Sequence, residues 1–393
     1  MNLNVATRSL PRCGTLLHSM NKRIHFFRKS HALDPQLAVY VVFLLVFGLI
    51  MLFSASVAVG LERFGDSMFF VKRQLFSLGI GFALLYICYR IPYKKWQQWS
   101  FILLLASAAL LFAVFIPGIG ITGQGAKRWI DLGIVTFQPS ELVKLTLILY
   151  LSAWLAERGP RAASGFRTGT MPFLTVMGLF AVLIMSQPDM GTLMLIFAIG
   201  LILFFAGGAS LSHLAALCVA GLGFIFVMVK MAPYRLARLT AFFDPDADPL
   251  GIGYHINQAL IAIGSGGFFG RGLGHSRQKF LYLPEVTGDS IFAIIAEETG
   301  FLVSAGIIIL FVLLFMRAYQ LSQRLSDSFG SYVLLGIGAW ITLQAFVNIG
   351  AMLSVLPLTG LPLPFISYGG SSLIITLGAI GILFNIAQHA KIR

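Results

Sequence analysis

Long apolar segments dominate the pattern of hydrophobic and polar positions along the chain. Runs of about 18 to 20 continuous apolar residues are typical of membrane helices, whereas barrel strands alternate in polarity. Ten runs are present, at 37–57, 75–89, 99–116, 142–156, 171–186, 190–206, 211–230, 291–316, 331–356 and 372–388. The pattern predicts an all-α polytopic membrane protein with about ten transmembrane helices, of which the short runs 75–89 and 142–156 extend into polar flanks.

The composition supports this class. Of the 393 residues, 58% are hydrophobic and only 11% are charged, and the mean hydropathy is +0.87, whereas soluble domains are nearer a quarter charged. The three cysteines (Cys13, Cys88 and Cys218) share no short spacing, so they indicate neither a disulfide framework nor a zinc site. No nucleic-acid motif is present, and we expect no nucleic-acid partner.

The chain ends and one long loop define the expected organisation. Residues 1–34 are polar and basic without a long apolar segment, which indicates a cytoplasmic tail rather than a signal peptide; a start at Met20 stays open. Basic tails remain in the cytoplasm, and an even number of helices places both termini there. Residues 35–393 then form a single transmembrane domain with an exterior loop at about 231–290.

The exterior side is unexpectedly basic for a protein with a net charge of +13. Its cations gather beside glycine-rich and tryptophan-bearing loops, which suggests an anionic ligand. Anchoring to lipid headgroups is the alternative for each single cation. The candidate cations for an anionic ligand are Arg73, Lys127, Arg128, Lys144 and Lys279.

The segment GQGAKRWIDLGIVTFQPSELVKL, residues 123–145, combines several candidate binding groups. Arginine pairs with phosphate oxygens through two hydrogen bonds, and Trp129 offers a flat face for a sugar or headgroup. Gln138 and Ser140 precede the next apolar run, and we expect Ser140 to cap that helix. Glu141 and Lys144 are spaced to pair on one helix face; a neutralising boundary pair and a functional pair both remain open.

Two other loops carry distinct signals. QPDMGT, residues 187–192, joins two apolar runs so closely that it predicts a helical hairpin, with Asp189 as the helix cap. In the long loop, INQALIAIG predicts a short helix, and GSGGFFGRGLG is a candidate for backbone N–H contacts with a phosphate. His255 and His275 have no paired cysteine or histidine nearby, so we interpret both as surface polar residues.

The segment YLPEVTGDSIFAIIAEE, residues 282–298, holds four of the fifteen acidic residues. Pro284 and Gly288 interrupt regular structure, so Asp289 or Ser290 should precede a helix beginning at Ile291. Asp289 would then lie at the exterior mouth of the bundle, and Glu285 is a second candidate acid there that could hold a cation or a metal. The two deeper carboxylates, Glu297 and Glu298, are expected to be paired internal struts.

Six segments together resemble the SEDS family (shape, elongation, division and sporulation), and the similarity covers nearly the whole chain from about Asp34. They are GAKRWIDLG, QPSELVKL, QPDMGT, the glycine-rich loop 251–274, GHSRQKFLYLPEVTGDSIFAIIAEETG and LPLTGLPLPFISYGGSSLI. The form S-x-Q-K-x-x-Y-L-P-E at 276–285 is more similar to the division member of the family than to its elongation member. Where the family commonly has His-Thr-Asp-Phe, this chain has Thr287-Gly288-Asp289-Ser290.

The resemblance implies a ten-helix fold and a peptidoglycan glycosyltransferase. It would polymerise lipid II, a disaccharide-pentapeptide on undecaprenyl pyrophosphate, into β-1,4-linked strands at the outer face of the cytoplasmic membrane during septal wall synthesis. Asp289 carries over as the catalytic base of an inverting reaction. The implied substrate-binding residues are Arg73, Lys127, Arg128, Trp129, Gln138, Ser140, Glu141, Lys144, Lys279 and Glu285.

The resemblance also implies partners and a cofactor. The partners are lipid II and the growing glycan strand, a class B penicillin-binding protein that acts as transpeptidase, and other divisome proteins. A divalent cation, Mg²⁺ or Mn²⁺, would assist the basic residues, and no organic cofactor is expected.

Two alternatives come from other functional classes. A lipid II flippase would use buried charges along a translocation path, but transporters place polar sites near the midplane and show internal repeats, which this sequence does not. A non-catalytic division scaffold would not need Asp289 beside cations.

Overall fold

The computed structural model describes residues 33–390 except 124–125, 132, 134–135 and 245–250. The predicted basic tail therefore lies almost entirely outside the described residues.

Ten long apolar helices occupy the positions of the ten predicted runs, so the predicted fold class is confirmed. Among the described residues, nine helical spans are long and apolar enough to cross a membrane, and α7 is a shorter apolar helix of 17 residues. The ten are α2 (Pro35–Phe64), α3 (Phe69–Arg90), α4 (Tyr93–Ala113), α5 (Pro139–Ala163), α6 (Met171–Met185, preceded by the π-helix η1, Phe166–Thr170), α7 (Met190–Ala206), α8 (Leu211–Lys230), α11 (Ile291–Arg324), α12 (Ser328–Met352) and α13 (Gly370–Ala387).

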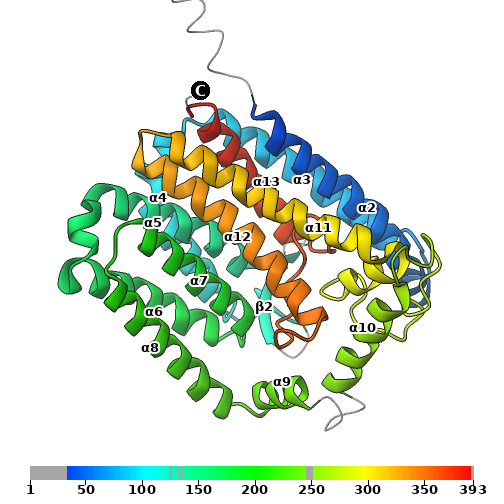
Figure 1. The fold of residues 1–393 in the computed structure, drawn as a ribbon. Helices are drawn as coiled ribbons and strands as arrows, with labels where there is room; N and C mark the ends of the chain where they lie inside the picture. Colours follow the sequence, from blue (N-terminus) through cyan, green and yellow to red (C-terminus); the bar gives the residue numbers. More distant parts are fainter. Residues whose placement is uncertain (1–32, 124–125, 132, 134–135, 245–250, 391–393) are drawn as a thin grey trace, which may run out of the picture.

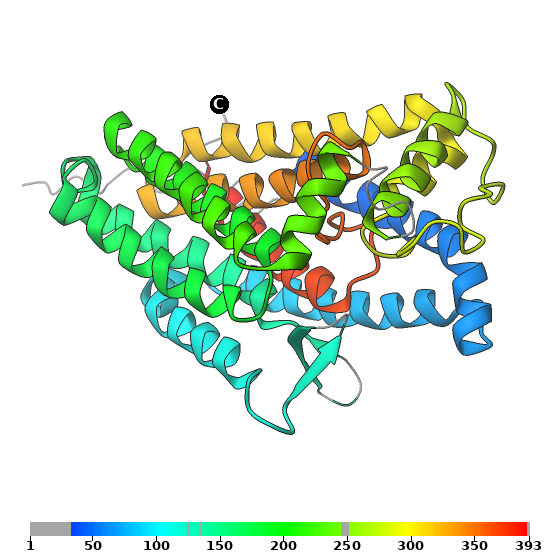
Figure 2. The same ribbon diagram turned by 90° about the horizontal axis from the view of Figure 1, so that it is seen from below.

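Helices α5, α12 and α13 form the interior of the bundle, and α8 lies at its edge (Figures 1 and 2). Helix α13 runs beside α3, where glycines allow close approach. A Cβ on Gly381 would lie 2.3 Å from the backbone oxygen of Leu85, and one on Gly81 would lie 2.5 Å from a methyl of Leu377. Small residues at such contacts let membrane helices pack without a hydrophobic driving force between them.

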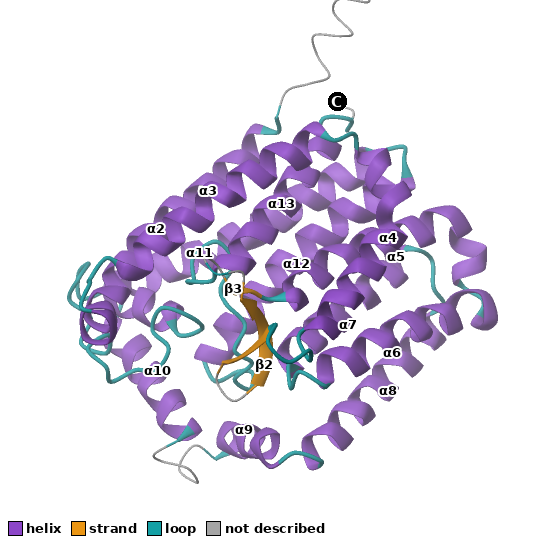
Figure 3. Cartoon of the chain, turned by 180° about the vertical axis from the view of Figure 1, so that it is seen from behind, coloured by secondary structure: helices purple, strands orange, loops and turns teal. Residues whose placement is uncertain are grey.

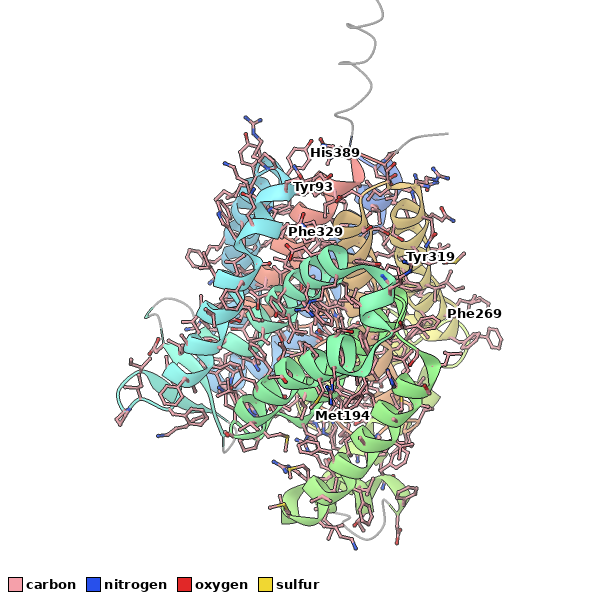
Figure 4. The ribbon with its side chains drawn as sticks, turned by 90° about the vertical axis from the view of Figure 1, so that its left-hand side faces the viewer. Tyr93, Met194, Phe269, Tyr319, Phe329 and His389 are labelled. Carbon is pink, nitrogen blue, oxygen red and sulfur yellow. The ribbon has the colours of Figure 1, made fainter. Side chains whose placement is uncertain are left out.

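Both described chain ends lie at the same end of the bundle (Figure 1). Arg317 of α11 forms an ion pair with Asp34 at the start of α2. The rings of Tyr93, Phe329 and His389 gather there, as Figure 4 shows. This placement agrees with an even number of spanning helices.

The opposite end of the bundle carries the structure outside the long helices (Figure 3). Strands β1 (Gly120–Gly123), β2 (Ala126–Asp131) and β3 (Thr136–Phe137) form an antiparallel sheet in that order. Helices α9 (Pro233–Phe243) and α10 (Ile252–Gly266) follow α8. The short helix predicted in the long loop is confirmed as part of α10, whereas the sheet and α9 were not predicted.

Helix α11 is interrupted at Gly300, whose φ of 76° and ψ of −175° are not helical. The glycine-rich loop fills the break: Arg271 and Gly272 donate backbone N–H groups to the carbonyls of Glu297 and Glu298, each at 3.0 Å, and Phe301 N–H donates to the Gly267 carbonyl at 2.9 Å. Broken membrane helices need such replacement partners. The hypothesis that this loop binds a phosphate through its backbone N–H groups is therefore wrong for Arg271 and Gly272.

Because only glycine readily adopts the backbone conformation of Gly300, we predict that Gly300→Ala destabilises the protein. The added Cβ would lie 2.3 Å from the Gly270 nitrogen and 2.6 Å from the Phe268 oxygen. Strain and overpacking together should cost roughly 2–5 kcal/mol. The measurement is thermal unfolding in detergent.

The matched control for this prediction is Gly306→Ala on the same helix. Nothing lies within 4 Å of a Cβ at Gly306, so this substitution should be neutral or stabilise by about 0.5–1 kcal/mol. Equal melting temperatures for the two variants would contradict the role assigned to the break.

Candidate functional site

Asp289 lies in a segment that is fastened to the bundle at successive residues. Three consecutive backbone carbonyls accept hydrogen bonds from other elements: Thr287 from the Tyr368 N–H (2.8 Å), Gly288 from the Ser367 hydroxyl (2.6 Å) and Asp289 from the Asn348 amide (2.8 Å). Helix α11 begins two residues later, and Ser290 rather than Asp289 is its N-cap residue. The backbone of Asp289 is therefore held independently of its side chain.

The carboxyl group of Asp289 has an unusual environment for an acid. Burial disfavours its charged form and raises its pKa to about 6, against the opposing effects of its own N–H, the Arg238 charge and the Ser290 N–H. Because carboxyl groups ordinarily titrate near 4, this one exchanges a proton much closer to neutral pH. Such a shift is typical of groups that act as acids or bases.

A pocket lined by arginines lies beside this segment. It is bounded by β2, the start of α7, the end of α8, α9 and the loop 357–359, and Met194 in Figure 4 is one of its lining residues. Its cavity volume is about 110 Å³, which is smaller than the ~300–1,000 Å³ typical of ligand pockets. The polar lining residues are Arg128, Asp189, Arg235, Arg238 and Thr359.

Backbone carbonyls orient the three arginines of this pocket. Arg128 donates to the carbonyls of Gln187 (2.7 Å) and Pro188 (2.5 Å), Arg235 to Met228 (3.0 Å) and Arg238 to Leu358 (3.2 Å). A guanidinium has five N–H donors, so Arg128 and Arg238 have donors beyond these contacts that an anion could use. Of the three, only Arg128 was a sequence-based candidate.

The start of α5 joins the same region. The Ser140 hydroxyl and the Gln138 amide both contact Asp189 Oδ2 at 3.4 Å, while Asp189 Oδ1 accepts from the Thr192 N–H. Asp189 therefore caps α7, as predicted. The prediction that Ser140 caps α5 is wrong, because Gln138 occupies the N-cap position and Ser140 lies inside the helix facing α7.

Glu141 and Lys144 form a fully buried pair, with Lys144 Nζ 2.7 Å from Glu141 Oε1. Lys144 also donates to Gln344 Oε1 at 2.8 Å, which in turn accepts from the Trp340 indole at 2.9 Å. The second oxygen of Glu141 is buried without a hydrogen-bond partner among the described residues. The predicted pairing is thus confirmed, and one lone carboxylate oxygen remains available to a ligand or water.

Helix α12 connects this pair to Asp289. Gln344 and Asn348 lie one turn apart, and their amide nitrogens donate to the carbonyls of Pro362 (2.9 Å) and Leu361 (2.8 Å). Asn348 also holds the Asp289 carbonyl. One helix face therefore fixes the loop 361–362, the Lys144 side chain and the Asp289 backbone together.

Lys279 is placed elsewhere, contrary to the prediction that it binds substrate. Its ammonium donates to Gly274 O (2.8 Å), Glu298 Oε1 (2.9 Å) and Ser54 Oγ (3.2 Å), and the residue is buried. All three of its N–H bonds have protein acceptors, so none is free for a phosphate. Lys279 instead neutralises Glu298 beside the break in α11, and Glu297 accepts from the Ser276 hydroxyl and the Arg277 N–H nearby.

The remaining predicted residues lie at the surface of the same end. Arg73 is exposed and stacks over the Phe69 ring at 4.5 Å, Lys127 is exposed on β2, and Trp129 is half-buried. Glu285 is exposed with a positive φ of 51°, and its carbonyl accepts from the N–H groups of Gly288 and Ser290. The structure does not place these four side chains in the arginine pocket.

The described residues contain no group of three or more His, Cys, Asp or Glu side chains arranged to hold a metal ion. Mg²⁺ often binds through one or two carboxylates and completes its shell with substrate phosphates. Among the described residues, Asp289 and Glu285 therefore do not form a metal centre by themselves.

Sequence reasoning missed three site residues. Arg235 and Arg238 are spaced i, i+3 in PYRLARL, so an amphipathic helix could have been read there, but nothing in the sequence placed it beside α7. The interpretation of His255 as a surface residue is wrong: it is partly buried, and its Nε2 lies 2.6 Å from the Ser290 hydroxyl.

The fold and site define a helical polytopic membrane protein with a partly buried acid beside a pocket lined by arginines, and several known proteins are similar to this chain. A family model described as "Cell cycle protein" (FTSW_RODA_SPOVE) matches residues 35–392. Stage V sporulation protein E of Bacillus subtilis is 40% identical over 92% of this chain and 99% of that protein. A probable peptidoglycan glycosyltransferase FtsW of Geobacter sp. (strain M18) is 38% identical over 93% of this chain and 99% of that protein.

Solved structures agree with the sequence matches. A chain from a peptidoglycan synthase complex superposes with a TM-score of 0.74 at 28% identity, covering 91% of this chain and 98% of that one. The rod shape determining protein RodA of Thermus thermophilus gives a TM-score of 0.67 at 27% identity, covering 92% and 99%. The chain belongs to the FtsW/RodA/SpoVE family, which confirms the resemblance to SEDS proteins.

We predict that breaking the buried pair destabilises the protein more than removing it. Lys144→Met leaves Glu141 uncompensated in the interior, which typically costs about 3–5 kcal/mol. The double variant Glu141→Gln/Lys144→Met removes both charges and should recover part of that loss. The measurement is thermal unfolding in detergent.

The control for the buried pair is Lys72→Met, which removes the exposed pair between Lys72 and Asp66. Solvent screens that pair, so the melting temperature should barely change. If the double variant loses as much melting temperature as Glu141→Gln and Lys144→Met lose together, the two charges do not interact as their distance indicates.

Proposed function

We propose that this protein is a peptidoglycan glycosyltransferase that polymerises lipid II into β-1,4-linked glycan strands. The observation that carries the proposal is the carboxyl group of Asp289, with a pKa of about 6, beside a pocket lined by Arg128, Arg235 and Arg238. Relatives that cover nearly the whole chain are named as probable peptidoglycan glycosyltransferases. We further propose that the reaction serves septal wall synthesis at the outer face of the cytoplasmic membrane.

Asp289 acts in this proposal as the general base. An acceptor sugar hydroxyl gives its proton to the carboxylate as its oxygen forms a bond to the anomeric carbon of the donor. The bond from that carbon to the diphosphate breaks at the same time, and the lipid diphosphate leaves with the electron pair. Attack opposite an α-linked diphosphate inverts the centre, so one carboxylate suffices, unlike the pair that hydrolases use.

The arginine pocket would stabilise the negative charge of the leaving group. A diphosphate departs as an anion and needs charge stabilisation rather than an acid. Arginines oriented by backbone carbonyls match phosphate oxygens with fixed geometry. Arg238 belongs to both parts of the site, since it lines the pocket and its charge acts on Asp289.

Mg²⁺ or Mn²⁺ and protein partners complete the proposal. A divalent cation shared between the acidic residues near Asp289 and the diphosphate would supply further charge stabilisation of the leaving group. The similar chain of known structure comes from a peptidoglycan synthase complex described as coordinating polymerization and crosslinking. We therefore propose a class B penicillin-binding protein as the transpeptidase partner, with other divisome proteins around it.

The buried charges favour an enzyme over a flippase. Glu141 pairs with Lys144, and Glu298 pairs with Lys279, all with their side chains almost fully covered. Charges fixed to one another inside the bundle stabilise it and do not form an open polar path. A scaffold, in turn, would have no use for an acid held near its titration point.

Our first prediction for this function concerns Asp289. Asp289→Asn should lower polymerisation by about 10²–10⁴-fold, because the amide cannot accept the proton. The test is a gel assay of glycan strands made from lipid II by the purified full-length protein with its transpeptidase partner and Mg²⁺. Equal activity of the variant would contradict the assignment, and wild type that moves lipid II across vesicles without polymerising it would favour the flippase.

The pH dependence follows from the same group. The base is the deprotonated carboxylate, and its pKa of about 6 in the free protein is raised. The kcat/KM of wild type should therefore be nearly constant above pH 7 and fall about tenfold for each pH unit below 6. A flat profile down to pH 5 would exclude Asp289 as the titrating base.

The arginine pocket gives a separate prediction. Arg128→Ala and Arg238→Ala each remove a charged donor from the anion, at roughly 1.5–3 kcal/mol, so kcat/KM for lipid II should fall about 10- to 100-fold. The control is Arg167→Ala, because Arg167 is exposed in η1, before the start of α6, whereas the pocket residues Pro188 and Asp189 follow the end of that helix. Steady-state rates over a range of lipid II concentrations decide between these outcomes.

A further inference from the structure

The segment that carries Asp289 has a fourth attachment, one residue beyond the three carbonyl contacts. Ser290 is fully buried, and its hydroxyl lies 2.6 Å from His255 Nε2 and 2.8 Å from the Pro284 carbonyl. The other three attachments come from α12 and the loop 367–368. Only this contact comes from α10, in the loop that joins α8 to α11.

The protons of this contact can be assigned by counting. A serine hydroxyl has one proton, and here it is donated to the Pro284 carbonyl. The hydroxyl oxygen must therefore accept its second hydrogen bond from His255, which requires the proton on Nε2. His255 thus donates an N–H that fixes the Ser290 side chain, and Ser290 is bonded covalently to Asp289.

We propose that His255 is a positioning residue for Asp289, acting through Ser290. The proposal rests on the function proposed above and adds a residue that touches neither substrate nor the reacting atoms. Docking of α10 onto the start of α11 then determines where the Asp289 carboxylate points. The segment Thr287-Gly288-Asp289-Ser290, where this chain departs from the common His-Thr-Asp-Phe, thus contains its own polar support.

The charges around this contact leave it intact across the working pH range. Burial lowers the pKa of His255, with Glu285 acting against this effect and Arg238 adding to it. The ring is therefore neutral near pH 7, and Nε2 carries a proton in both the neutral tautomer and the cation. Among the described residues, the charges that act on His255 are those of Glu285, in the preceding loop, and Arg238 of α9. The pH dependence of activity therefore comes from Asp289, whereas His255 fixes the position of the segment that carries it.

The experiment compares His255→Ala, Ser290→Ala and His255→Gln in the full-length protein with its transpeptidase partner. Misplacing a catalytic group by about 1 Å can cost up to about 100-fold, so the two alanine variants should lower kcat about 10- to 100-fold with little change in KM for lipid II. Glutamine also ends in an N–H donor, so His255→Gln should keep kcat within about threefold of wild type. The double alanine variant should be no slower than the slower single variant.

The pH profile separates positioning from general loss of folding. Freeing the segment lets water reach Asp289, so its burial weakens and the acid limb of kcat/KM should move to lower pH in His255→Ala. Misfolding would lower the whole profile without moving that limb. His275→Gln, at an exposed loop histidine, is the matched control and should leave rate and profile unchanged.

Hydrogen exchange of the substrate-free protein supplies a measurement that does not depend on activity. Amides of 287–293 should exchange faster in His255→Ala than in wild type and His255→Gln. Unchanged exchange, wild-type kcat in both alanine variants, or a glutamine variant as slow as alanine would each overturn the proposal. If wild type makes no glycan strands, the proposed function fails, and the exchange rates alone decide the role of His255.

Discussion

The absence of water in the hydrocarbon core is the constraint on which the rest of this structure depends. A polar group inside a bilayer that finds no partner within the protein costs several kcal/mol, which strongly favours structures that pair such groups. The interruption of α11 at Gly300 is possible only because the glycine-rich loop 267–272 supplies backbone partners. The buried carboxylates follow the same rule, each beside a lysine or a set of hydroxyl and N–H donors.

This constraint also explains how the site is built. The polar face of α12, with Gln344 and Asn348, satisfies the backbone of the loop 361–362 and at the same time holds Lys144 and the Asp289 carbonyl. Groups that satisfy one another are also rigid, and the role proposed for Asp289 needs a rigidly held carboxylate. The site therefore lies where the internal polar network reaches the end of the bundle opposite the chain termini.

The candidate site is assembled from two parts of the chain, the helical bundle and the loop that joins α8 to α11. The bundle supplies the pair Glu141–Lys144 from α5 and holds Asp289 just before α11, whereas α9 and α10 supply Arg235, Arg238 and His255. Phe269, which projects from the connection after α10 (Figure 4), is the most exposed large apolar side chain of that region. In the proposed enzyme, the position of the loop between α8 and α11 brings Arg235, Arg238 and His255 close to Asp289.

The sequence by itself determined the helices, the hairpin at Asp189 and the pairing of Glu141 with Lys144. These features depend on apolar length and on neighbours three or four residues apart, which a linear pattern contains. Only the tertiary structure decided which cations share a pocket. By sequence, Lys279 was as strong a candidate for binding an anionic ligand as Arg128, but its ammonium pairs with Glu298. His255 contacts Ser290, which lies 35 residues away in the sequence. The physical reason is that a buried polar side chain takes its role from whichever partner the packing of distant helices brings to it.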